Sequence, residues 1–254
     1  MKTTALAGRH IVITRPLGQA HQLEALIKQA SGTTVLFPLL AITALENYSA
    51  FDETIAQLDQ FDWAIFISSN AVQNSLPRLL KQKIPTHLRF AAIGPKTAAD
   101  LATFGIQNTL TPAHRFDSEA LLALPEMQAM KNKKVMIFRG VGGREVLADT
   151  LKIRGATVSF AESYRRINPQ QNLTPLSQLA AQNKLDAMVV TSSEAMRYLL
   201  NMADDATWLK NVKLCVNHER IAEEARARGL DVCVAVAPGD EAMMGCLIQA
   251  LNNE

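Results

Sequence analysis

The chain has 254 residues, of which 48% are hydrophobic and 20% charged, as in an ordinary globular protein. Its 26 basic and 24 acidic residues give a net charge of +2, which argues against a nucleic-acid partner but leaves open a local site for a small polyanion. No apolar run approaches the length of a membrane span, about 18 residues, and the apolar core of the N-terminus is too short for a signal peptide. We expect a cytoplasmic protein with no membrane partner.

The three cysteines and five histidines show no metal-ligand spacing. Cys215, Cys233 and Cys246 include no CxxC pair, so buried, reduced thiols are the simplest interpretation. We expect no metal site.

Apolar runs and stretches of helical periodicity alternate strictly along the chain. In the first half the clearest predicted strands lie at 10–14, 33–37, 63–67 and 89–93. In the second half they lie at 135–138, 156–160, 187–191 and 213–216. Each half is expected to hold five strands and five helices. Such alternation predicts parallel sheets with helices on both faces.

The two halves are copies of each other at an offset of 124 residues. At this offset Asp62 matches Asp186, Ser68 matches Ser192, and Arg15 matches Arg139. A repeat of this length is too long for a solenoid unit. The predicted fold class is therefore α/β, with two similar doubly wound, parallel-sheet (flavodoxin-like) domains that arose by internal duplication.

Two predicted helix starts carry runs of polar residues, namely Ser68, Ser69 and Asn70 in the first copy and Ser192 and Ser193 in the second. Serine and asparagine cap helix N-termini, and the free amides of such an end bind anions. A structural N-cap and an anion site are both consistent with this pattern. Glu194 replaces Asn70 in the second copy, which indicates that the two copies would not bind an anion equally.

A glycine-rich segment, Arg139–Arg144, follows the strand at 135–138. Glu145 occupies the place of the third glycine in a dinucleotide fingerprint, and no GK[ST] follows, so neither a dinucleotide site nor a P-loop is predicted. Gly142 and Gly143 between two arginines suit either a tight turn or a loop that grips carboxylates.

Two further segments carry polar groups at predicted strand ends. Gly94, Lys96 and Thr97 surround a helix start, which is either structural or anion-binding. Tyr164 follows the strand at 156–160 and precedes two arginines, so it either packs its ring or donates a proton. No nucleophile, metal cluster or carboxylate pair is evident. The residues alone predict a two-lobed α/β protein that binds a small polyanion in a cleft between its lobes.

Taken together and in order, these motifs resemble the uroporphyrinogen-III synthase family. The matching segments span nearly the whole chain: Ile11–Pro16, Phe66–Val72, Ala92–Ala98, Arg139–Glu145, Glu162–Arg165 and Val190–Ala195. The resemblance implies a lyase with no cofactor, which converts hydroxymethylbilane into uroporphyrinogen III with loss of water and inversion of ring D.

The resemblance also implies a domain division that cuts across the repeat. It places residues 1–38 and 169–254 in one domain and residues 44–160 in the other, joined by a two-stranded linker at 39–43 and 161–168. The active site is then expected in the cleft between the domains, and we expect a monomer.

The resemblance assigns roles to individual residues. Tyr164 matches a tyrosine that assists loss of the hydroxyl group as water, and Thr97 matches a hydroxyl near the substrate. The remaining expected substrate-binding residues are Arg15, Ser68, Ser69, Asn70, Gly94, Lys96, Arg139, Gly142, Gly143, Arg144, Ser192 and Ser193. The second-half counterpart of 94–97 is 217–220, which ends in Arg220, so the hydroxyl contact expected there is lost.

A non-catalytic, two-lobed α/β binding protein for a small polyanionic ligand is the alternative. Such a protein needs the anion-binding corners but not Tyr164. It would usually carry an export signal or an output domain, and neither is evident, so we expect the enzyme.

Overall fold

The computed structural model describes residues 4–170, 172–203 and 206–252. The chain forms two compact units, which we describe separately: unit 1 comprises Met1–Ala41 and Ile167–Glu254, and unit 2 comprises Ile42–Arg166. The predicted domain made of residues 1–38 and 169–254 includes some positions outside the described residues, namely 1–3, 171, 204–205 and 253–254.

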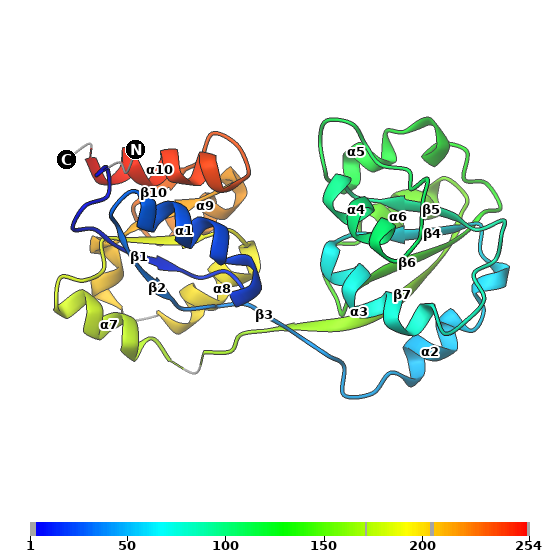
Figure 1. Ribbon diagram of the computed structural model, residues 1–254, viewed down its shortest axis with the longest axis horizontal. Helices are drawn as coiled ribbons and strands as arrows, with labels where there is room; N and C mark the ends of the chain where they lie inside the picture. The colour runs from blue at the N-terminus through cyan, green and yellow to red at the C-terminus, as the bar shows by residue number, and fades with distance from the viewer. Residues whose placement is uncertain (1–3, 171, 204–205, 253–254) are drawn as a thin grey trace. The chain divides into compact units, whose positions relative to one another are not determined.

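Unit 1, which contains β1, β2 and β10 (Figure 1), is built on a five-stranded sheet in the order β10-β9-β8-β1-β2. Its strands are β1 (His10–Ile13), β2 (Thr33–Leu36), β8 (Ala187–Val190), β9 (Lys213–Val216) and β10 (Val232–Val234). All neighbouring pairs are parallel. Numbered along the chain, the order is 2-1-3-4-5, which is that of flavodoxin-like folds.

Helices cover both faces of the unit 1 sheet. They are α1 (His21–Gln29), α7 (Thr174–Ala181), α8 (Ser193–Met202), α9 (Glu219–Arg226) and α10 (Asp240–Asn252), with 3-10 turns η1 (Leu17–Gln19) and η4 (Thr207–Asn211). Helices α1 and α10 pack in one core cluster, and α7, α8 and α9 pack in the other. Because both faces are buried, the strands are nearly continuous apolar runs.

Unit 2 is built on a second five-stranded sheet in the order β3-β7-β6-β4-β5. Its strands are β3 (Ala41–Thr43), β4 (Trp63–Phe66), β5 (Arg89–Ala92), β6 (Lys134–Gly140) and β7 (Thr157–Ile167). The four strands β7, β6, β4 and β5 are parallel neighbours.

Helices also cover both faces of the unit 2 sheet. They are α2 (Ser49–Ile55), α3 (Ser69–Leu79), α4 (Pro95–Thr103), α5 (Ser118–Leu122) and α6 (Val146–Ile153), with 3-10 turns η2 (Leu58–Gln60) and η3 (Pro125–Met127). Helices α2, α3 and α4 pack in one core cluster, which we call the α3 face of the sheet. Helices α5 and α6 pack in the cluster on the other face, the α6 face.

The duplication is visible in the topology. Strands β9-β8-β1-β2 of unit 1 correspond at the 124-residue offset to β5-β4-β6-β7 of unit 2, and the two sets are ordered alike. The fifth strand, β10, corresponds to an isolated parallel bridge between Leu110 and Ala91. Each sheet thus takes strands from both halves of the chain. The predicted α/β fold class, with two similar doubly wound domains, is confirmed.

The chain passes between the units at residues 41–42 and 166–167. The strands at these two points, β3 and β7, are neighbours in one sheet, so the linker is two-stranded as predicted. The sequence pattern ends the strand before Tyr164 at Phe160, whereas β7 continues to Ile167. This continuation stays paired with β6 as far as Tyr164.

One contact occurs in both copies and joins each pair of central strands. The Asp62 carboxylate, just before β4, accepts hydrogen bonds from the Lys134 amide and from the Lys133 ammonium group, both at 2.8 Å. In unit 1 Asp186 likewise accepts the His10 amide at 2.7 Å and Arg9 at 3.3 Å. The hydrogen bond from Lys133 lowers the pKa of Asp62 below its ordinary value of 3.8.

The three cysteines lie in unit 1 as free thiols, on β9, β10 and α10. Burial raises the pKa of the Cys233 thiol to about 12, so this side chain is a poor nucleophile near neutral pH. Among the described residues, no helix has both the length and the apolar character needed to cross a membrane.

We predict that Asp62→Asn lowers stability near neutral pH, because it removes the ion pair with Lys133. A carboxylate whose pKa is depressed on folding stabilises the protein above its unfolded pKa, and this contribution is lost as the pH falls through the folded value. The urea concentration at the midpoint of unfolding should be lower for the variant than for the wild type near neutral pH, and this difference should become smaller below pH 3.8. The exposed Asp59→Asn is the control, and an equal gap at every pH would contradict the prediction.

Candidate functional site

The predicted site residues of unit 2 follow neighbouring parallel strands. Ser68 follows β4, Gly94 follows β5 and Gly142 follows β6, while Tyr164 lies on β7 opposite the end of β6. The sheet order β7-β6-β4-β5 therefore places these corners along one edge, the carboxyl edge of the sheet. Ligands of open α/β sheets bind at this edge.

Tyr164 and Ser68 are in direct contact there. The Tyr164 side chain is buried, with 3% of its surface exposed, and its ring packs in the core on the α3 face. Its hydroxyl lies 3.3 Å from the Ser68 Oγ, and either atom can donate. Ser68 is also the N-cap of α3, since its Oγ accepts the Ala71 amide at 3.0 Å. The phenol thus lies at the positive end of a helix.

A β-bulge determines which way Tyr164 points. Along β6 and β7, Arg139 is opposite Glu162, but the next residue, Gly140, is opposite Tyr164, so Ser163 is an extra residue. Ala161 packs on the α3 face, and strict alternation would turn Tyr164 to the α6 face. The extra residue restores Tyr164 to the α3 face, where Ser68 lies. Bulges re-aim side chains in this way beside active sites.

Gly140 provides the space for the Tyr164 ring. A Cβ atom on Gly140 would lie 2.5 Å from Cε2 and 2.7 Å from Cζ of Tyr164, which is closer than atoms can approach. Gly140 was not among the predicted site residues. A glycine at the end of a buried strand, beside a glycine-rich loop, is the feature of the sequence that indicates that another group packs closely against the backbone there.

Arg139 is held within the protein. Its side chain is 3% exposed, its guanidinium group lies 4.6 Å from the centre of the Phe160 ring, and it donates to the carbonyl oxygens of Gly140 and Gly142. A buried cation needs such partners. In the structure, therefore, Arg139 fastens the start of the glycine loop.

The glycine loop has a backbone that favours glycine. Gly142 and Gly143 have φ values of 66° and 106°, in the left-handed region. The Gly142 amide donates to Glu162 at 3.0 Å, and Arg166 donates to the carbonyl oxygens of Val141 and Gly142 at 3.1 and 3.3 Å. The loop is therefore tied to β7 on both sides of the bulge.

Ser69 and Asn70 are the first two residues of α3, directly after the Ser68 cap. Arg144 and the 94–97 corner complete the predicted residues of unit 2. Arg144 donates to Glu119 at 2.8 Å, and the pKa of Glu119 is lowered, first by its own backbone amide and then by Arg144. Gly94 is the N-cap of α4, and a Cβ there would lie 2.9 Å from Phe116. Lys96 is exposed, whereas Thr97 is buried.

Unit 1 carries the second set of corners, at the carboxyl ends of β1, β8 and β9. Arg15 forms an ion pair with Asp240, the first residue of α10. Ser192 is the N-cap of α8, and its Oγ accepts the backbone amides two and three residues further along the chain at 3.2 and 3.4 Å. Ser193 accepts a hydrogen bond from Arg220 at 3.3 Å, so Arg220 faces the second Ser-Ser corner.

Two cavities in unit 2 differ in their relation to these corners. A cavity of about 460 Å³ lies beside the glycine loop and β7, with Val141, Glu162 and Arg165 in its lining. A larger one, of about 560 Å³, lies at the opposite edge of the sheet, where Trp63 and Arg89 begin their strands. Its larger volume does not make it the site, because the polar corners are at the other edge. Within the described residues, no group of three His, Cys, Asp or Glu side chains is placed to hold a metal ion.

The fold and the corners define a class of protein: a duplicated, two-unit α/β protein with capped helix N-termini, arginines and a buried phenol at the carboxyl edges of its sheets. The family model described as uroporphyrinogen-III synthase HemD matches residues 21–245. The chain belongs to the uroporphyrinogen-III synthase family, a family of hydro-lyases in tetrapyrrole biosynthesis. The resemblance seen in the motifs, and the enzyme that it implies, are confirmed.

Individual relatives agree with this assignment. The uroporphyrinogen-III synthase of Escherichia coli (strain K12) is 32% identical over 243 residues, which cover 93% of this chain and 99% of that protein. The Proteus mirabilis enzyme is 35% identical over 159 residues, or 62% of this chain and 80% of its own.

Solved structures share the fold. A mutant uroporphyrinogen III synthase from the extremely thermophilic bacterium Thermus thermophilus has a TM-score of 0.70 at 17% identity and covers 97% of this chain and 100% of its own. The uroporphyrinogen-III synthetase from Helicobacter pylori 26695 has a TM-score of 0.60 at 17% identity and covers 95% of this chain and 99% of its own. At this identity the likeness concerns the fold alone.

We predict that Gly140→Ala destabilises the protein, because the new methyl group and the Tyr164 ring cannot occupy the same space. Overpacking of this kind costs about 1–3 kcal/mol, measurable by urea unfolding. Gly245→Ala is the matched control: it lies inside α10 with no atom within 4 Å of its added Cβ. This variant should be neutral or more stable by about 0.5–1 kcal/mol. Equal stability of the two variants would contradict the role given to Gly140.

Proposed function

We propose that this chain cyclises hydroxymethylbilane to uroporphyrinogen III, with loss of water and inversion of ring D, and that Tyr164 is its proton donor. The observation that carries the assignment of Tyr164 is the placement of its hydroxyl, 3.3 Å from the cap of α3 at the carboxyl edge of the sheet. Membership of the family supports the reaction.

The substrate's charge suits the corners of both units. Hydroxymethylbilane carries acetate and propionate chains on all four rings, so it offers eight carboxylates. Each contact of a carboxylate with a helix N-terminus is worth about 0.3–1 kcal/mol, and up to about 2 kcal/mol when partly buried. Several such contacts acting together give a clamp, and no single one dominates.

The carboxylates of the bilane bind at these corners. The helix N-termini and the glycine loop offer amides, hydroxyls and cations, from Arg15, Ser68, Ser69, Asn70, Gly94, Lys96, Thr97, Arg139, Gly142, Gly143, Arg144, Ser192 and Ser193. Arg139 acts through the loop that it fastens. Corners of both units bind carboxylates of the bilane, and the enzyme works as a monomer.

The chemical step needs one proton delivered to the leaving hydroxyl group. The Tyr164 phenol gives its proton to that oxygen as the carbon–oxygen bond breaks, and water leaves with the bonding electrons. The cation that remains on the bilane is balanced in part by its own carboxylates. Inversion of ring D exchanges its bonds: the cationic carbon bonds to the α-carbon of ring D that carries the bridge from ring C, and the bond from that α-carbon to the bridge then breaks. The bridge carbon bonds to the free α-carbon of ring D, which loses a proton, and this proton returns to the phenolate. Orientation and electrostatic stabilisation supply the rest of the catalysis.

A product assay tests the reaction directly. Fresh hydroxymethylbilane is supplied, the products are oxidised, and the uroporphyrin I and III isomers are separated. Without catalysis the bilane closes to isomer I. We expect a large excess of isomer III, whereas isomer I at the background rate would leave a binding protein as the better account.

We predict that Tyr164→Phe lowers kcat by about 10²–10⁴-fold, the contribution usual for a positioned proton donor. The ring and its packing against Gly140 are kept, so the fold should survive. Tyr198→Phe removes a hydroxyl from α8 in unit 1 and is the matched control, expected to stay within about twofold of wild type. A loss below about tenfold in Tyr164→Phe would exclude the proton-donor role.

A further inference from the structure

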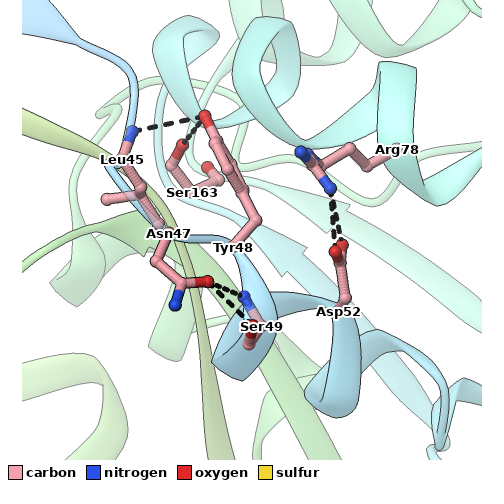
Figure 2. Close-up of polar contacts among 7 residues, drawn as sticks. All are labelled: Leu45, Asn47, Tyr48, Ser49, Asp52, Arg78 and Ser163. Carbon is pink, nitrogen blue, oxygen red and sulfur yellow. Dashed lines mark hydrogen bonds and ion pairs between the residues drawn. The ribbon is translucent and has the colours of Figure 1, made fainter.

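The hydroxyl group of Tyr48 contacts the strand that carries Tyr164. It donates to the carbonyl oxygen of Ser163 at 3.2 Å and accepts the amide of Leu45 at 3.4 Å. Figure 2 shows the hydroxyl between these two backbone groups. Leu45 lies two residues after the end of β3, and Ser163 lies on β7. The Tyr48 hydroxyl therefore connects the segment after β3 to β7.

The ring of Tyr48 is held from two sides. The Arg78 guanidinium group lies 3.8 Å from the ring centre, and the Phe51 ring packs against it edge-on at 6.1 Å between centres. Arg78 is in turn fixed by the Asp52 carboxylate at 2.8 and 3.0 Å (Figure 2). The hydroxyl is therefore presented to Ser163 in a fixed direction.

Ser163 is the extra residue of the β-bulge that turns Tyr164 toward Ser68. The extra residue of a bulge is left out of the strand ladder, so its carbonyl needs another donor when it is buried. Ser163 is fully buried, and its Oγ has no hydrogen-bond partner among the described residues. Its carbonyl, in contrast, has the Tyr48 hydroxyl.

We infer that Tyr48 is a positioning residue for the reaction: its hydroxyl stabilises the bulge at Ser163 and so holds the Tyr164 phenol in its catalytic direction. This inference rests on the role proposed for Tyr164. Tyr48 acts only through the backbone of β7, because its hydroxyl bonds to the Ser163 carbonyl and the Leu45 amide rather than to the carboxyl-edge corners.

Tyr48→Phe tests the inference, because it removes only the hydroxyl and keeps the ring between Arg78 and Phe51. We expect kcat to fall about fivefold to fiftyfold, the range that corresponds to losing one hydrogen bond to a buried carbonyl, while KM stays within about twofold. Ser163→Ala is the matched control: it removes a hydroxyl without a partner among the described residues and leaves the carbonyl in place, so kcat should be unchanged.

Amide hydrogen exchange measured by NMR gives a readout independent of activity. The Val141 amide donates to the Tyr164 carbonyl at 2.8 Å, directly beside the bulge. In Tyr48→Phe we expect faster exchange at Val141 and Leu45, and no change in either amide in Ser163→Ala. Unchanged exchange at Val141 would overturn the inference.

The double variant Tyr48→Phe/Tyr164→Phe separates this inference from the proposed function. If Tyr48 acts through Tyr164, Tyr48→Phe should change kcat by less than about twofold once the Tyr164 hydroxyl is gone. Equal losses from Tyr48→Phe in both backgrounds would overturn the inference while leaving the role of Tyr164 intact. Full turnover in Tyr164→Phe alone would instead refute the proposed donor, and exchange at Val141 would then decide whether Tyr48 holds the bulge.

Discussion

The β-bulge at Ser163 is the feature on which the candidate site depends. One extra residue in β7 moves Tyr164 from one face of the sheet to the other, where its hydroxyl meets the cap of α3. The neighbouring residues fit this arrangement. Gly140 lacks the side chain that would displace the ring, and Tyr48 satisfies the carbonyl that the bulge releases. A buried polar backbone group and a tightly packed ring are each costly to misplace, so the phenol has one direction.

The two sheets are similar because the domain is duplicated, but the copies have diverged at the residues beside the carboxyl ends of their strands. The serine N-caps are kept in both, at Ser68 and Ser192. The position equivalent to Tyr164 in unit 1 is Leu40, which is buried in an apolar core. The equivalent arginines have also diverged: Arg15 pairs with Asp240, whereas Arg139 holds loop carbonyls. Helix ends suited to anions thus remain in both units, and the phenol is present in one.

The sequence was sufficient for the parts of the structure that depend on local pattern. Strict alternation of strands and helices, together with the 124-residue repeat, predicts two parallel sheets, and Ser68 is recognisable as a cap from its place between strand and helix. The bulge was not predictable, because residues 161–167 lack the apolar alternation of a strand, and the pairing with β6, which extends as far as Tyr164, is a contact between distant segments. Tyr48 was missed for the same kind of reason, since its partner Ser163 is distant in sequence. Arg139 is expected from the sequence to bind substrate, whereas its burial over Phe160 was not predictable, because it depends on the tertiary fold.

The central claim is that the Tyr164 phenol transfers a proton as the hydroxyl group leaves. Replacing Tyr164 by a series of fluorinated tyrosines of increasing acidity tests it most directly, because ring size and hydrogen bonding change little while the strength of the acid rises. With turnover measured at a pH where every phenol in the series stays protonated, a proton donor should give a kcat that rises with phenol acidity. A kcat that stays level across the series would contradict proton donation and leave Tyr164 as a group that only orients the substrate.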